Sequence, residues 1–378
     1  MNLLSLIVTT GLNLIHAPFS HNVARSDDGI EDFSVFPFNI LKNTPACVTL
    51  TVAVGENHMK VTSLPRGFCS NCCQAKITRD VRFMLYTKAD PKRGVPIVPF
   101  NKVGAAARAG VQPDRDTVIF IHGFSEPSPG ESGTAIVDAY LSRPEYFNVI
   151  LLDWSELSSF PWYRTAVENV KLVGEILRNF IKTFTKSGEI AIDRLHVIGF
   201  SLGSHIASRA GKNLQGGVRI PRITALDPAF PDFPLQDRTK RLAETDADYI
   251  DVIHTDSGIF GFPLSIGHAD FYPNGGRALQ PGCQPSYLAK QRIIDQVLAC
   301  SHVRAWRLYA ESVRNPDAFP ATQCRMFRGP AKECNFTTDA YMGYRSNKNY
   351  VGQFYLRTDY KAPYGLKPEV QEVYPAAN

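Results

Sequence analysis

The strongest constraint on the fold is a short apolar run, a tight turn centred on a serine and a helix, in direct succession. Residues 195–198 (LHVI) lead into GFSLG at 199–203, and the residues that follow repeat apolar side chains at helical spacing. This is the G-x-S-x-G turn between strand and helix, where glycines let the two elements pack closely. Ser201 would then lie above a sheet, at a helix N-terminus whose free N–H groups can hold an anion. We therefore predict that Ser201 is a nucleophile, with a purely structural serine turn as the alternative.

A nucleophilic serine requires a general base, and the base requires an acid that orients it. In the α/β-hydrolase arrangement the three residues follow in the order Ser, Asp, His. Residues 222–226 have the character of a short buried strand, and Asp227 comes directly after it. An aspartate at the carboxyl end of a strand beside the serine turn is well placed to be the acid. Asp251 and Asp256 flank the next apolar run and are the alternative acids.

The base must be a histidine downstream of the acid. His302, in the segment ACSHVR at 299–304, satisfies this order. The chain contains nine histidines, however, so position alone does not decide between His302, His254 and His268.

Strands and helices are predicted to alternate along much of the chain. The helix at 166–184 is the clearest, because large apolar side chains recur there at helical spacing. Alternation of this kind predicts an α/β fold, with a mainly parallel central sheet flanked by helices in a single catalytic domain. The expected strands are 118–121, 149–152, 195–199, 223–226 and 250–253, and a second helix is expected at 202–213.

Several further motifs follow one another from residue 120 onward, and together they resemble one family. The chain is similar to the pancreatic-lipase-like family of animal lipases, within the α/β hydrolases, over roughly residues 76–360. The resemblance implies the α/β-hydrolase fold and the hydrolysis of acyl esters. The motifs are FIHGF at 120–124, LLDWS at 151–155, GFSLGSH at 199–205, ALDPAFP at 225–231, YIDVIHTD at 249–256, GHADFYPNGG at 267–276, QPGC at 280–283 and CSHVRAW at 300–306.

The position of these motifs implies a complete catalytic triad. The family's nucleophile falls on Ser201, its acid on Asp227 and its base on His302. The presence of all three residues distinguishes this chain from family members that have lost the triad and serve as yolk or carrier proteins.

Two backbone N–H groups are predicted to form the oxyanion hole. Geometry points to the N–H of Leu202, the residue after the nucleophile. The resemblance points to the N–H of Phe124, in the loop after an early strand. His122, His205 and His254 are interpreted as residues that fix the backbone or the core and take no part in catalysis.

The family's calcium-binding loop falls on residues 238–246. Arg241 and Asp246 are kept there, but Arg238 and Ala243 replace two expected acidic ligands. One carboxylate with backbone carbonyls is a poor calcium site. We therefore predict no structural calcium, and nothing in the sequence indicates another metal or a cofactor.

Several features predict a secreted protein. The start of the chain has an apolar stretch that ends near Ala17 and holds no acidic residue, as in a signal peptide. The even number of cysteines, eight, fits an oxidising compartment. Asn335 begins the only N-glycosylation sequon and is expected in a surface loop. The predicted organisation is a signal peptide at 1–20, an N-terminal extension at 21–75, a lipase domain at 76–365 and a tail at 366–378.

The resemblance also implies two disulfides. Cys283 and Cys300 match the pair that pins the base of the family's lid, and Cys324 and Cys334 match a second pair. Disulfides are favoured over zinc or redox chemistry for the C-x-x-C motif, because no second ligand pair accompanies it. The pairing of the remaining cysteines stays open: Cys47, Cys69, Cys72 and Cys73.

The formal net charge of +5 is small and scattered, with no basic run, so no nucleic-acid partner is expected. The chain ends soon after 355–365, a segment that resembles the last strand and exit of the catalytic domain. No room remains for the β-sandwich domain of colipase-dependent relatives, and we expect no colipase partner. The expected substrate is a glycerolipid at a lipid–water interface, with peripheral contact to a membrane or lipoprotein.

The segment between Cys283 and Cys300 is predicted to carry a lid. It contains a short apolar helical face with charges opposite, which suits an element that covers an apolar site or lies on lipid. An ordinary surface helix is the alternative. The apolar residues of this face are Ile293, Ile294, Val297 and Leu298.

A second loop, DSGIFGFPLSI at 256–266, is short. In the family that the chain resembles, triacylglycerol lipases typically carry longer versions of this loop and of the lid, and phospholipase A1 members have trimmed ones. The short loop favours phospholipase A1 activity at the sn-1 position. The amphipathic lid favours a triacylglycerol or galactolipid lipase, and a non-enzymatic lipid carrier is the third hypothesis. The apolar side chains expected to face an acyl chain or an interface are Phe260, Phe262, Leu264 and Ile266.

Overall fold

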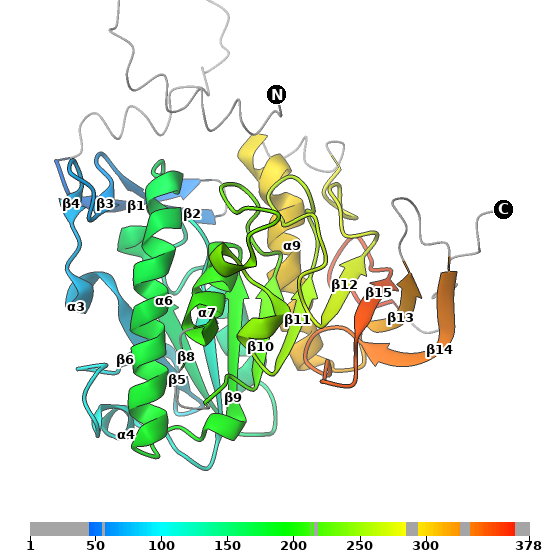
Figure 1. The fold of residues 1–378 in the computed structure, drawn as a ribbon, viewed down its shortest axis with the longest axis horizontal. Helices are drawn as coiled ribbons and strands as arrows, with labels where there is room; N and C mark the ends of the chain where they lie inside the picture. Colours follow the sequence, from blue (N-terminus) through cyan, green and yellow to red (C-terminus); the bar gives the residue numbers. More distant parts are fainter. Residues whose placement is uncertain are drawn as a thin grey trace, which may run out of the picture.

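The fold is built on one 11-stranded sheet, seen in the computed structural model of Figure 1. The structure describes residues 45–54, 57–212, 214, 218–284, 294–325 and 333–366, so the predicted signal peptide lies outside the described residues. In sheet order the strands are β14 (Glu333–Tyr341), β13 (Pro320–Arg325), β15 (Gly352–Leu356), β12 (Ala269–Pro273), β11 (Tyr249–Ile253), β10 (Arg222–Leu226), β9 (Leu195–Phe200), β7 (Asp116–Ile121), β8 (Phe147–Asp153), β5 (Arg82–Thr87) and β6 (Asp90–Pro96).

The centre of this sheet is parallel and its edges are antiparallel. Every pair from β8 through β7, β9, β10, β11 and β12 to β15 runs parallel. The pairs β5–β8, β5–β6, β13–β15 and β13–β14 are antiparallel. The α/β-hydrolase fold predicted from the sequence is therefore confirmed, and all five expected strands are present within one or two residues of their expected bounds.

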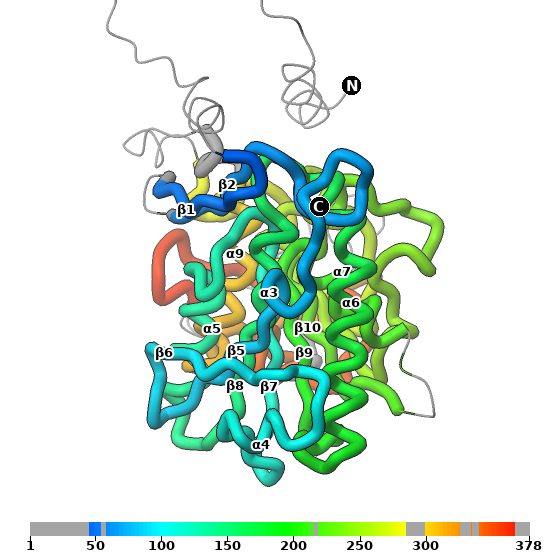
Figure 2. Tube along the Cα trace, turned by 90° about the vertical axis from the view of Figure 1, so that its left-hand side faces the viewer, coloured from blue at the N-terminus to red at the C-terminus, as the bar shows by residue number. Residues whose placement is uncertain are grey.

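Helices cover both faces of the sheet, and each face has its own apolar core. On one face α6 (Tyr163–Lys186) and α7 (Leu202–Lys212) pack on the strands, and on the other face α5 (Glu131–Leu141) and α9 (Ile294–Arg314) do so. Figure 2 shows the sheet between these two layers. Two cores arise because successive side chains of a strand point to opposite faces of the sheet, as strand β7 illustrates. Ile119 and Ile121 enter the core under α6, whereas Val118 and Phe120 enter the core under α9.

The N-terminal extension has structure of its own. Strands β1 (Thr49–Val54) and β2 (Asn57–Thr62) form an antiparallel hairpin, and β3 (Arg66–Gly67) pairs with β4 (Cys73–Gln74). The disulfides Cys47–Cys73 and Cys69–Cys72 lie within this segment, which answers the pairing that the sequence leaves open. The shorter elements elsewhere are α3 (Ile77–Asp80), α4 (Ala105–Ala109), η1 (Ser155–Leu157), η2 (Ile192–Arg194), η3 (Arg238–Lys240) and η4 (Glu244–Asp246).

The expectation that Asn335 lies in a surface loop is wrong. Its backbone belongs to β14, the outermost strand of the sheet, where it pairs with Gln323 of β13. The disulfide Cys324–Cys334 joins the same two strands at the neighbouring position, so the cysteine next to the sequon marks a strand pair. The side chain of Asn335 lies outside the described residues. Within the described part of the chain, no helix is both long and apolar enough to cross a membrane.

Asp251, one of the alternative acids, is fully buried and forms an ion pair with the partly buried Arg222 of the neighbouring strand. Its carboxylate accepts hydrogen bonds from Arg222 Nε at 2.8 Å and Nη2 at 3.0 Å, and from Thr224 Oγ1 at 2.9 Å. Arg222 also donates to the carbonyl of Gly343 at 2.7 Å. This pair therefore ties neighbouring strands β10 and β11 to a loop near the sheet edge.

We expect Asp251→Ala to lower the free energy of unfolding by about 3 kcal/mol, because it leaves the partly buried Arg222 guanidinium without its counter-charge. The matched control is Asp248→Ala, which removes the acid of an exposed pair with Arg219. That change should cost less than about 1 kcal/mol. Urea unfolding followed by circular dichroism measures both, and equal losses for the two variants would contradict the prediction.

Candidate active site

The predicted serine turn is present between β9 and α7. Strand β9 ends at Phe200, α7 begins at Leu202, and Ser201 between them has a φ of 54°, a conformation that non-glycine residues rarely adopt. A Cβ on Gly203 would lie 2.2 Å from the carbonyl oxygen of Ile121, so only glycine lets the helix approach β7 this closely. The turn thus presents Ser201 at the carboxyl edge of the sheet, directly before a helix N-terminus.

Asp227 is next to Ser201 because their strands are in register. Phe200 of β9 pairs with Leu226 of β10, so Ser201 and Asp227 are the first residues after a paired position. The N–H of Ser201 donates to the carbonyl of Leu226 at 3.0 Å. Asp227 is fully buried, and its Oδ1 accepts hydrogen bonds from the N–H groups of Thr255 at 2.9 Å and Asp256 at 3.1 Å.

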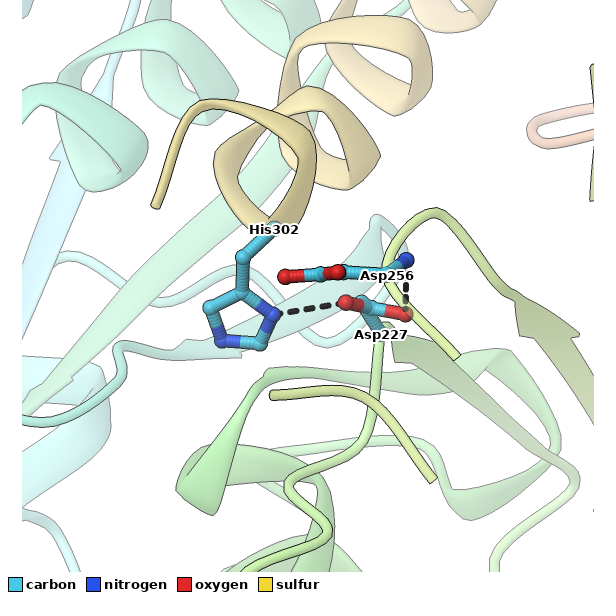
Figure 3. A group of neighbouring side chains, drawn as sticks. All are labelled: Asp227, Asp256 and His302. Atoms are coloured by element: carbon cyan, nitrogen blue, oxygen red, sulfur yellow. Dashed lines mark hydrogen bonds and ion pairs between the residues drawn. The ribbon is translucent and has the colours of Figure 1, made fainter. Parts of the chain in front are cut away.

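His302 joins this pair from the opposite layer. It lies in α9, and its Nδ1 donates to Oδ2 of Asp227 at 2.6 Å (Figure 3). The imidazole also lies against two aromatic rings, with centroid distances of 4.8 Å to Phe200 and 5.7 Å to Phe260. The structure therefore brings an acid and a base together beside Phe200, the residue that precedes the buried Ser201.

The other candidate bases lie elsewhere. His254 is fully buried and hydrogen-bonds Asp270 Oδ1 through Nε2 at 2.8 Å. Nδ1 of His268 accepts from the N–H of Ile250 at 3.0 Å. Neither histidine contacts Asp227 in the described part of the chain, so the geometry favours His302.

Two further histidines predicted to be structural also serve the backbone. His205 donates from Nε2 to the carbonyl of Ala229 at 2.8 Å and accepts from the N–H of Leu242 at 3.1 Å. Burial lowers the pKa of His205 to about 3, so its ring stays neutral. Nε2 of His122 accepts from the N–H of Trp154 at 3.2 Å.

Of the two residues whose backbone N–H groups are expected in an oxyanion hole, Leu202 directly follows Ser201 and Phe124 follows Gly123, which lies close to Ser201. The N–H of Leu202 belongs to the first turn of α7, where helical N–H groups have no intrahelical partner. Phe124 follows β7. The residue before it, Gly123, approaches the serine closely: a Cβ built on Gly123 would lie 3.1 Å from Ser201 Cβ. The ring of Phe124 packs edge-on against Tyr163, with the ring centroids 5.2 Å apart.

The short 256–266 loop folds back onto the segment after Asp227. The N–H of Phe230 donates to the carbonyl of Phe260 at 2.7 Å, and the N–H of Phe262 donates to that of Pro228 at 2.7 Å. Phe262 and Ile266 are buried in the core, so the expectation that they face an acyl chain or an interface is wrong. The other two apolar side chains of the loop are placed differently. Leu264 is 44% exposed, and the ring of Phe260 lies beside His302.

The predicted lid segment is only partly described. Cys283 and Cys300 are joined by a disulfide, the pair that the resemblance implies. Ile293 lies outside the described residues, but the backbone of Ile294, Val297 and Leu298 belongs to the first turns of α9. The backbone at these positions is therefore continuous with the helix that carries His302, because no helix-breaking residue intervenes.

The residues of the family's calcium loop do not fit a calcium ion. The carboxylate of Asp246 accepts hydrogen bonds from Lys212 Nζ, from Ser208 Oγ at 2.6 Å and from the N–H of Ala243 at 3.0 Å. The ammonium group already supplies the positive charge at this position. Arg238, in place of an acidic ligand, pairs with Glu244.

A third acidic residue, Asp256, lies beside the acid and the base (Figure 3). Potential metal-ligating atoms of Asp227, Asp256 and His302 all lie within 4.8 Å of one another, but Asp227 and His302 already satisfy each other. Neither carboxyl oxygen of Asp256 has a hydrogen-bond partner among the described residues. Burial first, and then the charge of Asp227, raise the pKa of Asp256 to about 8. Sequence reasoning named Asp256 as an acid but had no signal for its lack of partners.

Comparison with known proteins shows the family of this chain. The model of the family described as Lipase matches residues 47–364, most of the chain and part of the predicted N-terminal extension. The chain belongs to the lipase family.

The relatives of this chain include one named as a triacylglycerol lipase and one named as inactive. The chain is 34% identical to human "Pancreatic lipase-related protein 2" over 66% of this chain and 54% of that protein. It is 33% identical to "Pancreatic triacylglycerol lipase" from Sus scrofa over 74% of this chain and 66% of that protein. The human "Inactive pancreatic lipase-related protein 1" is 34% identical over 65% of this chain and 54% of its own length. The chain thus matches between about half and two thirds of the length of these relatives.

We expect Gly261→Ala to lower any ester-hydrolysing activity of this chain at least about tenfold. A Cβ at this position would lie 2.3 Å from Asp227 Oδ1, so the carboxylate that orients His302, or the loop itself, must shift. Such a movement weakens the orientation of the base, on which catalysis depends steeply. Initial rates on a soluble ester, compared with the thermal unfolding midpoint, test this: a folded variant with wild-type rates would contradict it.

We expect Asp256→Asn to stabilise the lipase progressively, relative to wild type, as the pH rises from about 4 to about 8. In this range the unfolded carboxyl is ionised and the folded carboxyl is protonated, because its pKa is raised to about 8. Wild type therefore loses stability with rising pH, by at most about 1.4 kcal/mol per pH unit for one proton, and the amide does not. Chemical unfolding at pH 5 and pH 8 measures the difference. An equal difference at both pH values would be incompatible with a protonated Asp256.

Proposed function

We propose that this chain is a secreted serine carboxylic ester hydrolase that cleaves acyl esters of glycerolipids, with phospholipase A1 activity at the sn-1 position. The hydrolase proposal rests above all on the 2.6 Å contact between His302 Nδ1 and Asp227 Oδ2 beside the Ser201 turn. Acid, base and serine come from three separate segments of the chain, and catalysis explains their meeting at one sheet edge.

In the proposed mechanism, the second ring nitrogen of His302 takes the proton of Ser201 as its oxygen attacks the acyl carbonyl. The N–H groups of Leu202 and Phe124 stabilise the oxyanion, each by a factor of about a hundred or more in rate. His302 then protonates the leaving glycerol oxygen, and water repeats the cycle on the acyl-enzyme. Asp227 holds the imidazole in the required tautomer and stabilises its charged form.

The finer proposal, phospholipase A1, is supported by the short 256–266 loop. Its backbone bonds to Pro228 and Phe230 draw the loop toward the body of the protein, leaving little chain to cover the site. An open edge of this kind would admit a polar head group. Phe260, beside His302, would then contact the acyl chain.

Two other functions have support of their own. A triacylglycerol or galactolipid lipase is favoured by similarity to a relative named as a triacylglycerol lipase. A non-enzymatic lipid carrier is favoured by similarity to a relative named as inactive. The chain covers only part of both relatives, so neither name transfers directly.

Secretion and a lipid surface complete the proposal. Four disulfides join all eight cysteines, as in proteins of oxidising compartments. We propose that the enzyme acts at a lipid–water interface, where the segment between Cys283 and Cys300 serves as a lid. No metal, cofactor or colipase enters the proposed reaction.

We expect a fluorophosphonate probe to label the wild-type protein stoichiometrically and to leave Ser201→Ala unlabelled, because only an activated serine attacks the probe. Ser265→Ala, at an exposed serine of the 256–266 loop, is the control and should label fully. No labelling of folded wild type would move the protein to the carrier class.

We expect wild type to release fatty acid faster from phosphatidylcholine than from triolein, both presented as mixed micelles of the same detergent. An open edge at the short loop accommodates a charged head group, which explains the direction. The measurement is the initial rate of fatty-acid release per labelled site. Faster cleavage of triolein would keep the serine mechanism and overturn the phospholipase assignment.

A further inference from the structure

The N-terminal hairpin is bonded to the loop that carries Phe124. The outer edge of β2 pairs with two catalytic-domain segments: the N–H of Lys60 donates to the carbonyl of Ser125 at 2.7 Å, and the N–H of Thr62 donates to that of Phe160 at 3.0 Å. The N–H of Phe160 in turn donates to the carbonyl of Lys60 at 2.8 Å, and Val61 forms a parallel bridge with Phe160. Figure 2 shows the hairpin at one end of the molecule and α4 at the other.

These bonds fix the backbone immediately after Phe124. Ser125 has a φ of 59°, which costs energy in a non-glycine residue and must be held by its surroundings. Both of its backbone groups are held, since its N–H donates to the carbonyl of Ser158 at 2.7 Å and its carbonyl accepts from Lys60. On the other side, Gly123 rests against Ser201. The Phe124 peptide therefore lies between the serine turn and β2.

The hairpin is itself anchored by charge and by covalent bonds. Glu156 of η1 accepts a hydrogen bond from Thr49 Oγ1 at 2.6 Å and lies 3.8 Å from Lys60 Nζ. Arg66 is buried, lies 3.7 Å from Glu156 and donates to the carbonyl of Cys47 at 2.7 Å. The disulfide Cys47–Cys73 closes the segment. Because the hairpin β1–β2 is anchored by these contacts, it can hold the loop after β7 in one conformation.

We propose that β2 is a positioning element of the oxyanion site: its N–H at Lys60 holds Ser125, and thereby aims the N–H of Phe124 at the position of the developing oxyanion. This rests on the proposed serine mechanism. It gives the N-terminal extension a role in the transition state, because a preorganised donor pays no reorganisation cost during reaction. Loss of the Lys60–Ser125 bond should therefore lower kcat and leave KM nearly unchanged.

The test is Lys60→Pro, which removes the N–H that bonds Ser125. The matched control is His58→Pro, on the same edge of the same strand, whose N–H is not a donor to Ser125 or Phe160. Both variants are assayed on p-nitrophenyl butyrate below its solubility limit, with rates normalised to the endpoint of fluorophosphonate labelling. We expect kcat to fall at least about tenfold in Lys60→Pro and to stay within about twofold in His58→Pro, with KM within about twofold in both.

A second readout separates positioning from general damage. An alkyl boronic acid forms a tetrahedral adduct that mimics the oxyanion, so its affinity should fall in parallel with kcat in Lys60→Pro alone. If circular dichroism shows that Lys60→Pro does not fold, the variant Trp162→Phe is used to test the positioning role instead. That change replaces the indole, whose N–H donates to the carbonyl of Thr62 at 3.0 Å, with a smaller ring that has no donor, and we expect a smaller loss of kcat, about twofold to fivefold.

The outcomes distinguish this inference from the proposed function. Equal kcat values and boronic-acid affinities in Lys60→Pro and His58→Pro, with wild type active and labelled, would overturn the positioning role alone. Unchanged kinetics in Trp162→Phe would do the same where that variant decides. Wild type that is neither labelled nor active would overturn the serine mechanism, and the positioning role with it.

Discussion

The candidate site depends on the in-register parallel pairing of β9, β10 and β11. Phe200 pairs with Leu226, and Leu226 pairs with Ile253, so the three strands end at the same level. Everything that follows them collects at one edge: the serine turn, Asp227 and the segment whose N–H groups hold Asp227. A slip of one residue in either pairing would exchange the side chains that enter the two cores and separate the serine from its acid.

The two helical layers contribute to this edge from opposite sides. Helix α7, on one face, begins at Leu202 and offers its free N–H groups. Helix α9, on the other face, carries His302, and its packing on α5 and the sheet sets where the imidazole meets Asp227. The hairpin β1–β2 contacts this edge through the bond from Lys60 to Ser125. The chemistry thus needs both cores intact, because each fixes a different reacting group.

The parts of the fold and site that could be predicted from the sequence are those with a local signal. The strand, turn and helix around Ser201 are encoded within twenty residues, and the central strands are short apolar runs. Features made by distant partners left no such signal. The Arg222–Asp251 pair, the lack of partners at Asp256 and the bond from Lys60 to Ser125 depend on chain segments that meet only after folding. Even Asn335 follows this rule, because its strand exists through pairing with β13.

Asp227 is oriented by main-chain groups. Its Oδ1 is held by the N–H groups of Thr255 and Asp256, which any amino acid except proline supplies. The side chains at these two positions do not hold the acid, so they can change without altering its orientation. Gly261 differs, because its lack of a side chain matters: no larger residue leaves room for the Asp227 carboxylate. The site thus tolerates side-chain variation where backbone N–H groups hold Asp227 and does not tolerate it at Gly261.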